Sequence, residues 1–286
     1  MLNFIKFKEL TRLEQSPFGL PFVATGALLP FANPHFHFEG SWLRLLWILP
    51  AFFAARFSGM AFNQLIDRFV DGRNPRTANR PIPTGRIIAK EAKWVAWGGL
   101  FALFVIGSQI NLLCFSFAPL VAILLFVYSY MKRFHASAHF VLGSIYFLAP
   151  FLAWAAVTGT LAMVPAVLGL AAFFWISGND IIYALNDYHF DCANGLHSIP
   201  VRFGPKKSLQ IARGLFLCSI AALVALGFMA KLGGLYFLAP LVATLALVYF
   251  HILGVKESRL FFFSVAIVSS AVMFFTLGDI LWHVWL

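Results

Sequence analysis

Four aspartates occur in two pairs with the same spacing: Asp67 with Asp71, and Asp187 with Asp191. On a helix, residues four apart lie on one face, with Cβ atoms roughly 5–6 Å apart. Two carboxylates at that distance repel each other by about 3 kcal/mol at an effective dielectric of about 20. A cation must compensate this charge, and carboxylate oxygens are ligands that Mg²⁺ prefers. We therefore predict that the four aspartates bind Mg²⁺.

Each pair belongs to a copy of the pattern D-x-x-x-D-x-x-N, which follows a long apolar run and precedes a basic loop. One such pair is usually a solvated helix cap. Two matching copies in a chain with only 11 Asp and Glu residues favour a functional site. Basic side chains near Mg²⁺ suit phosphate, which arginine binds in bidentate fashion. The residues that we expect to contact a diphosphate are Arg76 and Arg80 after the first copy, and Lys206 and Lys207 after the second.

The rest of the chain is too apolar for an ordinary soluble domain. Hydrophobic residues make up 61% and charged residues 11%, with a mean hydropathy of +0.84; globular chains average roughly 45–50% and about 25%. Runs of about 20 apolar residues indicate helices that cross a bilayer, where open sheet edges would stay unsatisfied. We predict an all-α polytopic membrane protein. Its net charge of +10 fits cytoplasmic loops, so we expect no nucleic-acid partner.

Nine apolar runs predict about nine transmembrane helices in a single domain that spans residues 1–286. The first run is short and contains Pro21 and Pro30. The runs are Phe18–Asn33, Trp42–Phe62, Trp94–Ile110, Leu112–Tyr130, Phe140–Val157, Leu161–Tyr183, Leu209–Ala230, Leu235–Val255 and Leu260–Leu286.

Most Lys and Arg residues fall in alternate loops, which predicts the orientation of the chain. The positive-inside rule places the N-terminus and the two motif loops, at about 63–93 and 184–208, in the cytoplasm. An odd number of helices then places the C-terminus on the other side, and we expect a bacterial inner membrane. Lys206 and Lys207 are explained equally well by this orientation signal and by phosphate binding.

The two motif copies also suggest how the helices are arranged. The second copy follows the sixth predicted helix and the first follows the second, so they occupy equivalent places four helices apart. Repeated halves with a polar site at their junction recur in membrane proteins. We expect two pseudo-symmetric halves around a central cavity, with the motifs at its mouth.

Both motifs resemble the signatures of a known family. The segment Asn63-x-x-x-Asp67-x-x-x-Asp71, with the later R-T-A-N-R-P and T-G-R stretches, resembles the first signature of the UbiA superfamily of intramembrane aromatic prenyltransferases. The segment Asp180–Asp191 is similar to the second signature. The resemblance covers nearly the whole chain. The run Gly195–Gly204 is similar to the 4-hydroxybenzoate polyprenyltransferase-like branch, some members of which serve the futalosine route to menaquinone.

The resemblance implies Mg²⁺-dependent transfer of a polyprenyl group from its diphosphate to a ring carbon of an aromatic acid such as 4-hydroxybenzoate, in respiratory quinone biosynthesis. It implies that the four motif aspartates hold Mg²⁺ against the diphosphate and are catalytic. Asn63 and Tyr183, each four residues before the first aspartate of its motif, would contact phosphate or metal-bound water. His197 is a further phosphate-contact candidate.

Two polar residues are expected deeper in the membrane. Arg56 precedes Asn63 by seven residues and Asp180 precedes Asp187 by seven, so each shares a helix face with its motif about two turns away. Charges inside a membrane are costly and usually functional. By resemblance, Arg56 binds the acceptor carboxylate. Asp180 orients or deprotonates the acceptor hydroxyl, or pairs with Arg56.

Other functions remain open on sequence alone. Within the superfamily the acceptor could be dihydroxynaphthoate for menaquinone, haem, chlorophyllide or glycerol phosphate. Outside it, a non-enzymatic transporter would also combine many helices, repeats and buried charge. A membrane scaffold would not need paired acids or a buried arginine. Acids gathered at one membrane face favour the enzyme.

Overall fold

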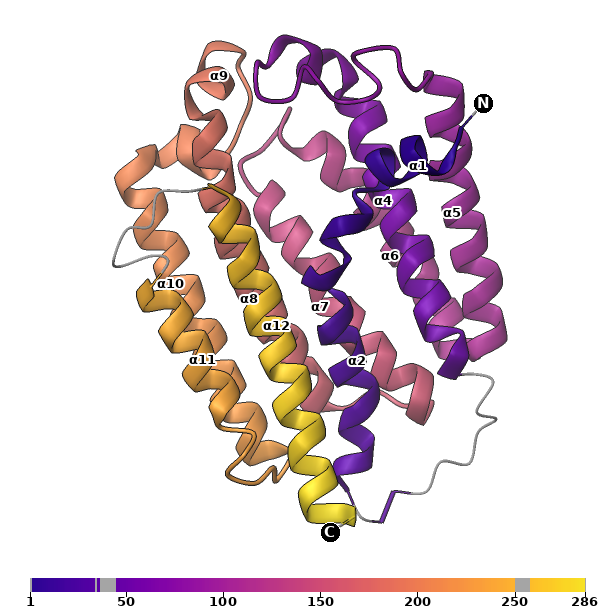
Figure 1. The fold of residues 1–286 in the computed structure, drawn as a ribbon, viewed down its shortest axis with the longest axis vertical. Helices are drawn as coiled ribbons and strands as arrows, with labels where there is room; N and C mark the ends of the chain where they lie inside the picture. The colour runs from indigo at the N-terminus through magenta and orange to yellow at the C-terminus, as the bar shows by residue number, and fades with distance from the viewer. Residues whose placement is uncertain (1, 34, 37–44, 250–257, 286) are drawn as a thin grey trace.

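The computed structural model describes residues 2–33, 35–36, 45–249 and 258–285, and these residues form helices and connecting turns without a strand. The long helices run roughly parallel to one axis (Figure 1). The helices are α1 (Phe4–Thr11), α2 (Leu20–Leu28), α4 (Ile48–Arg73), α5 (Ala89–Ile110), α6 (Leu112–Met131), α7 (Ala138–Thr158), α8 (Met163–Ala184), α9 (Tyr188–Ala193), α10 (Ile199–Met229), α11 (Leu238–Leu247) and α12 (Ser258–Ile280).

These helices confirm the predicted all-α membrane protein. In the described residues, six helices are long and apolar enough to cross a bilayer: α5, α6, α7, α8 continued through α9, α10 and α12. The segments Leu20–Ala32 and Leu238–Leu247 are shorter apolar helices. Helix α4 has 26 residues, about 39 Å at 1.5 Å per residue, and carries the first motif. Each of the nine predicted runs thus contains a helix. Residues 42–44, 250–255 and 286, which belong to three of these runs, lie outside the described residues.

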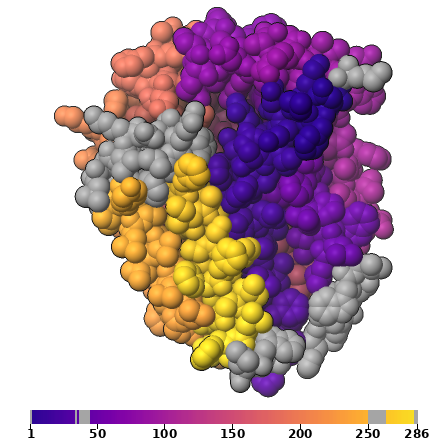
Figure 2. Space-filling model, in the orientation of Figure 1, coloured from indigo at the N-terminus to yellow at the C-terminus, as the bar shows by residue number. Residues whose placement is uncertain are grey.

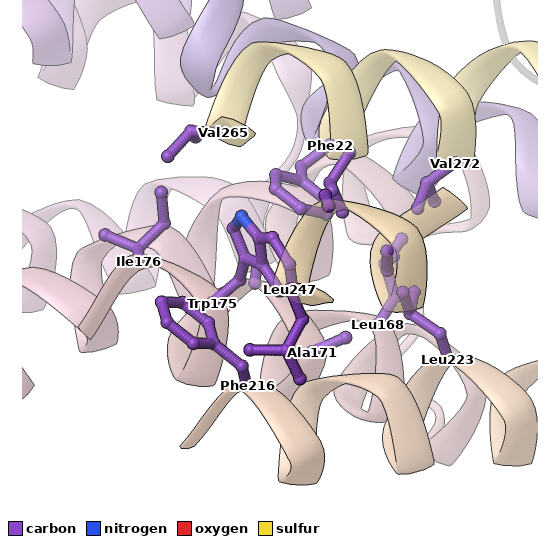
Figure 3. Packing of buried hydrophobic residues seen from close by; sticks show 14 of the residues in the cluster. Phe22, Leu168, Ala171, Trp175, Ile176, Phe216, Leu223, Leu247, Val265 and Val272 are labelled. Carbon is purple, nitrogen blue, oxygen red and sulfur yellow. The ribbon is translucent and has the colours of Figure 1, made fainter. Parts of the chain in front are cut away.

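Buried hydrophobic residues form two clusters, which agree with an arrangement in two halves. One joins α1, α4, α5, α6 and α7, and the other joins α2, α8, α10, α11 and α12. In the second cluster Trp175 of α8 packs on Phe216 of α10 with ring centroids 4.8 Å apart, while Phe22 and Val272 lie nearby (Figure 3). Helix α2, although N-terminal in sequence, therefore packs with the C-terminal half.

Helices α7 and α8 approach each other closely at Gly143. A Cβ atom there would lie 2.9 Å from the Phe173 carbonyl oxygen and would also collide with Ser177. The Ser177 hydroxyl donates a hydrogen bond to the His139 carbonyl at 3.2 Å. The missing side chain at Gly143 therefore lets the two helices bring His139 next to α8.

The N-terminal segment, which contains α1 and α2, runs along the bundle, and its N-terminus lies near the motif loops (Figure 1). The C-terminus lies at the opposite end of the bundle. On one face the N-terminal segment runs beside α12 (Figure 2), where the Ser269 hydroxyl donates to the Pro17 carbonyl at 3.2 Å. The Gln64 side chain on α4 donates to the carbonyls of Leu10 at 2.7 Å and Glu9 at 3.1 Å. Helix α4 thus fixes α1 in place.

Candidate active site

The first motif lies on α4, as predicted. Asn63 donates to one oxygen of Asp67 at 3.1 Å, and the other oxygen accepts from Arg133 at 3.2 Å. Asp71 is buried and accepts from Arg80 at 2.7 Å. Since all three polar positions face the same way on one helix, the spacing argument holds for this motif.

The second motif differs from the predicted geometry. Helix α8 ends at Ala184, and a short 3₁₀ helix, Leu185–Asp187, separates it from α9. Asp187 has φ −102° and ψ 4°, outside the helical region, so it and Asp191 are not on one continuous α-helix. The expectation of two carboxylates on a single helix face is wrong for this pair, because the chain tightens into a 3₁₀ turn between the bundle and α9.

Arg76, from the loop after α4, joins the two motifs. Its guanidinium makes a two-pronged ion pair with Asp187, with Nε 2.7 Å from Oδ1, and hydrogen-bonds the Tyr183 hydroxyl. It also lies 4.7 Å from the centre of the Tyr183 ring, a cation–π distance. Burial alone lowers the pKa of Arg76, but the hydrogen bonds to Asp187 and Tyr183 outweigh it and raise that pKa above its usual range. Arg76 is therefore a permanent cation at the junction.

The two motif copies are not equivalent in use. Asn74, the last residue of the first D-x-x-x-D-x-x-N pattern, donates to Asp187 at 2.8 Å across the junction. Asn194, its counterpart, donates to the Phe190 carbonyl of its own helix at 2.9 Å. The Asn of the first motif thus contacts the other half, whereas its counterpart in the second motif contacts its own helix.

Three of the four motif aspartates are thus paired with arginine: Asp67 with Arg133, Asp71 with Arg80, and Asp187 with Arg76. Asp191 is buried, and its Oδ2 has no hydrogen-bond partner in the described residues. Among the described residues, no group of three His, Cys, Asp or Glu side chains is arranged so that it could hold a metal ion. The set of donors still fits a hard divalent cation, because such ions bind carboxylate oxygens and Asp191 Oδ2 has no other partner in that part of the chain. The arginines that now pair with the other aspartates can bind phosphate instead.

A cavity of about 360 Å³ runs from the motifs into the bundle, between the two halves. Asn63, Arg80 and Tyr183 line it at the motif end, and Arg56 and Asp180 line it deeper in α4 and α8. Most of the remaining wall is apolar and comes from α2, α4, α5, α6, α7 and α12. A charged mouth over an apolar interior suits an amphipathic substrate.

Arg56 and Asp180 each contact a different residue rather than each other. An Nη atom of Arg56 donates to the Arg12 carbonyl at 2.7 Å, while its buried Nε has no partner in the described residues. Asp180 Oδ2 lies 2.6 Å from Nδ1 of His139. The expected alternative of an Arg56–Asp180 pair is therefore not what is observed, and Arg56 retains a donor for a ligand.

Three predicted phosphate contacts lie apart from this cavity. Lys206 and Lys207 are exposed on α10, and the His197 side chain is exposed in the second motif loop. None of them lines the cavity. Their contact with a diphosphate stays a prediction.

Sequence reasoning missed three residues of the site: Arg133, Asn74 and His139. Arg133 had been counted only as a charge that sets orientation, and its partner Asp67 is 66 residues away. Asn74 carried a signal, since the Asn recurs in both motifs. No sequence signal identified His139, because its contact depends on the packing of α7 against α8.

Comparison with known proteins identifies the family. Residues 20–260 match the model of the UbiA prenyltransferase family. The chain belongs to this family. A 4-hydroxybenzoate octaprenyltransferase of Vibrio parahaemolyticus serotype O3:K6 is 34% identical over 230 residues, 78% of each chain. One from Histophilus somni strain 2336 is 30% identical over 197 residues, 69% of this chain and 68% of that protein.

Solved structures confirm the UbiA fold. A UbiA homolog from Aeropyrum pernix K1 superposes with a TM-score of 0.81 and 26% identity, over 93% of this chain and 98% of that one. A UbiA homolog from Archaeoglobus fulgidus bound to GPP and Mg²⁺ gives a TM-score of 0.71 and 23% identity, over 96% and 99%. Family membership makes this chain an integral membrane prenyltransferase and removes the transporter and scaffold alternatives.

Proposed function

We propose that this UbiA-family member transfers a polyprenyl group from its diphosphate to a ring carbon of an aromatic acid of the 4-hydroxybenzoate type, in respiratory quinone biosynthesis. The observation that carries the proposal is the cavity, in which Asn63, Arg80 and Tyr183 at the motif end lead to Arg56 and Asp180, deeper within a mostly apolar wall. The name shared by the bacterial relatives supports this acceptor class.

The diphosphate end is assigned to the two motifs. Asn63, Arg80 and Tyr183 face the cavity there, and Arg76 lies against Tyr183. On binding a diphosphate, Arg76 and Arg80 exchange aspartate oxygens for phosphate oxygens, which arginine also binds in bidentate geometry. Lys206 and Lys207 remain candidates for outer contacts with the same phosphates.

A divalent cation, which we take to be Mg²⁺, would be held by Asp67, Asp71, Asp187 and Asp191. Once their arginines turn to phosphate, three of these carboxylates become available alongside the orphaned oxygen of Asp191. When bound, the ion neutralises charge that develops on the departing diphosphate. The archaeal homolog bound to GPP and Mg²⁺ supports this assignment.

The acceptor end is assigned to Arg56 and Asp180. Arg56 lines the cavity and its Nε has no partner in the described residues, so its guanidinium would bind the acceptor carboxylate through a charge-assisted bond. Asp180 reaches the same cavity from the opposite half. An acid with its carboxylate at Arg56 and its hydroxyl at Asp180 is thus held by both of its polar ends.

Five changes of bonding complete the reaction. Asp180 accepts the acceptor hydroxyl proton, which raises the electron density of the ring. The allylic C–O bond breaks with its electron pair on the diphosphate, and a ring carbon bonds to the prenyl C1. That carbon loses its proton to water, and Asp180 returns its own proton to the ring oxygen. Arg76 and Arg80 stabilise the diphosphate as its charge increases.

A direct assay tests the proposal. The purified protein in detergent would receive radiolabelled geranyl diphosphate, Mg²⁺ and one acceptor from a panel containing 4-hydroxybenzoate and a dihydroxynaphthoate, followed by extraction of prenylated product. We expect turnover with 4-hydroxybenzoate. Turnover only with the naphthoate would move the enzyme to menaquinone biosynthesis, and no turnover with any aromatic acid would contradict the proposal.

A further inference from the structure

His139 is a buried titratable residue that lies just behind the cavity wall. Its side chain is completely buried, and Nδ1 lies 2.6 Å from Oδ2 of Asp180. Asp180 lines the cavity and His139 does not. The imidazole is therefore placed to act on the acceptor only through Asp180.

The partners of the two ring nitrogens fix the tautomer of His139. The backbone N–H of Ile199, which can only donate, lies 3.3 Å from Nε2. Nε2 must then be the acceptor nitrogen, and the single ring proton sits on Nδ1. That proton is donated to Asp180 Oδ2, so Asp180 is held as a carboxylate that accepts.

The same contacts connect the second motif loop to Asp180. Within this stretch, Ile199 begins α10, and the backbone N–H of His197 donates to the Lys132 carbonyl at 2.6 Å. This stretch therefore contacts the other half at two places, the Lys132 carbonyl at the end of α6 and the His139 ring on α7. A change in the loop can reach Asp180 through a single imidazole.

We infer that His139 is a positioning residue, which holds Asp180 ionised and oriented through one oxygen and leaves the other oxygen for the acceptor hydroxyl. The inference rests on the proposed role of Asp180. It adds a residue that touches neither substrate but on which removal of the hydroxyl proton depends. A donor on one side and an acceptor on the other are what the position requires, so glutamine is a possible replacement and an aliphatic residue is not.

The test compares His139→Gln with His139→Leu. Glutamine keeps one donor for Asp180 and one acceptor for the Ile199 N–H, whereas leucine removes both. With geranyl diphosphate and 4-hydroxybenzoate, we expect His139→Leu to lower kcat by roughly 10²-fold, the scale of general-base catalysis. The KM for geranyl diphosphate should stay within about twofold, since the phosphate end is untouched, and His139→Gln should recover most of kcat. Equal losses in both variants, or wild-type kcat in the leucine variant, would overturn the inference.

Asp180→Asn separates this inference from the proposed function. If Asp180→Asn retains wild-type kcat, the proposed role of Asp180 is wrong whatever His139 does. If Asp180→Asn is impaired while folded His139→Leu is not, the proposed function stands and the positioning role falls. We expect both single variants to be impaired and the double variant to be no slower than Asp180→Asn.

A further variant covers the case in which the leucine protein does not fold. His139→Ala removes both the donor to Asp180 and the acceptor for the Ile199 N–H without adding bulk. We expect it to fold, to have low kcat and to gain nothing from a higher acceptor concentration. Wild-type kcat in a folded His139→Ala protein would contradict the positioning role.

Discussion

At the scale of single residues, Asp191 gives the most direct test of the proposed metal site. Its Oδ2 is buried without a partner in the described residues, so it has no structural role that asparagine would fail to fill. We expect Asp191→Asn to reduce the initial prenylation rate by about 10²-fold or more, through lost stabilisation of developing charge, with an unchanged melting temperature. Glu91→Gln, at the start of α5, is the control acid and should keep full activity. A wild-type rate for Asp191→Asn would contradict the metal assignment.

Arg56 tests the class of acceptor. We expect Arg56→Ala to raise the KM for 4-hydroxybenzoate and leave that for geranyl diphosphate nearly unchanged, because the residue lies about two turns from the phosphate end. Loss of one partner of a buried charge-assisted pair costs about 2–5 kcal/mol. A phenol without a carboxylate should be used about equally by both proteins in steady-state assays. Weakened diphosphate binding with a normal acceptor KM would place Arg56 in the phosphate site instead.

The arginine–aspartate pairs predict that metal and diphosphate bind together. Mn²⁺ alone must compete with Arg76, Arg80 and Arg133 for the aspartate carboxylates. Inorganic diphosphate binds the arginines and so frees the carboxylates for the metal. By linkage, each ligand should strengthen binding of the other, typically 5–150-fold. Electron paramagnetic resonance of free Mn²⁺, titrated with and without diphosphate, measures this coupling.

Arg76→Gln should reduce that coupling, because it frees Asp187 in advance. Arg73→Gln is the matched control, since Arg73 is exposed and its Nε donates to the Phe69 carbonyl of its own helix at 3.4 Å. Equal Mn²⁺ affinity with and without diphosphate in the wild-type protein would show that the pairs do not restrict the metal.

At the scale of elements, the sequence predicts what is local. Asp67 and Asp71 share one face of α4 because their spacing matches the helical period. The 3₁₀ turn at Asp187 was not predictable, since Tyr183–Asp191 contains neither Gly nor Pro to signal a break. His139 and Asp180, 41 residues apart, meet only because α7 and α8 pack closely. Such partners follow from tertiary contacts, and a single sequence does not record them.

The close approach of α7 and α8 leads to a prediction for Gly143. Gly143→Ala should push the helices apart, because its Cβ would meet Ser177 and the Phe173 carbonyl; overpacking typically costs about 1–3 kcal/mol. We expect a lower melting temperature in detergent together with reduced kcat, as His139 withdraws from Asp180. Gly98→Ala, in α5 with open space around it, should instead be neutral or stabilising. Equal melting temperatures for the two variants would contradict this packing argument.

At the scale of the whole molecule, both motif loops and the N-terminus lie at one end of the bundle and the C-terminus at the other (Figure 1). With the Lys/Arg distribution, this predicts a cytoplasmic N-terminus and a C-terminus across the membrane. A C-terminal fusion to a phosphatase that is active only in the periplasm should be active, and a fluorescent protein that folds only in the cytoplasm should be dark there. The opposite pair of results would reverse the orientation.

The hold of α4 on the N-terminal segment also has a practical side. Arg56 donates to the Arg12 carbonyl and Gln64 donates to the Leu10 carbonyl, and Arg12 itself lines the cavity. The start of the chain is therefore part of the wall of the reaction chamber. A purification tag fused before Phe4 would therefore be attached next to the cavity wall and could disturb it. A tag fused after α12 would lie at the opposite end of the bundle, away from the proposed active site.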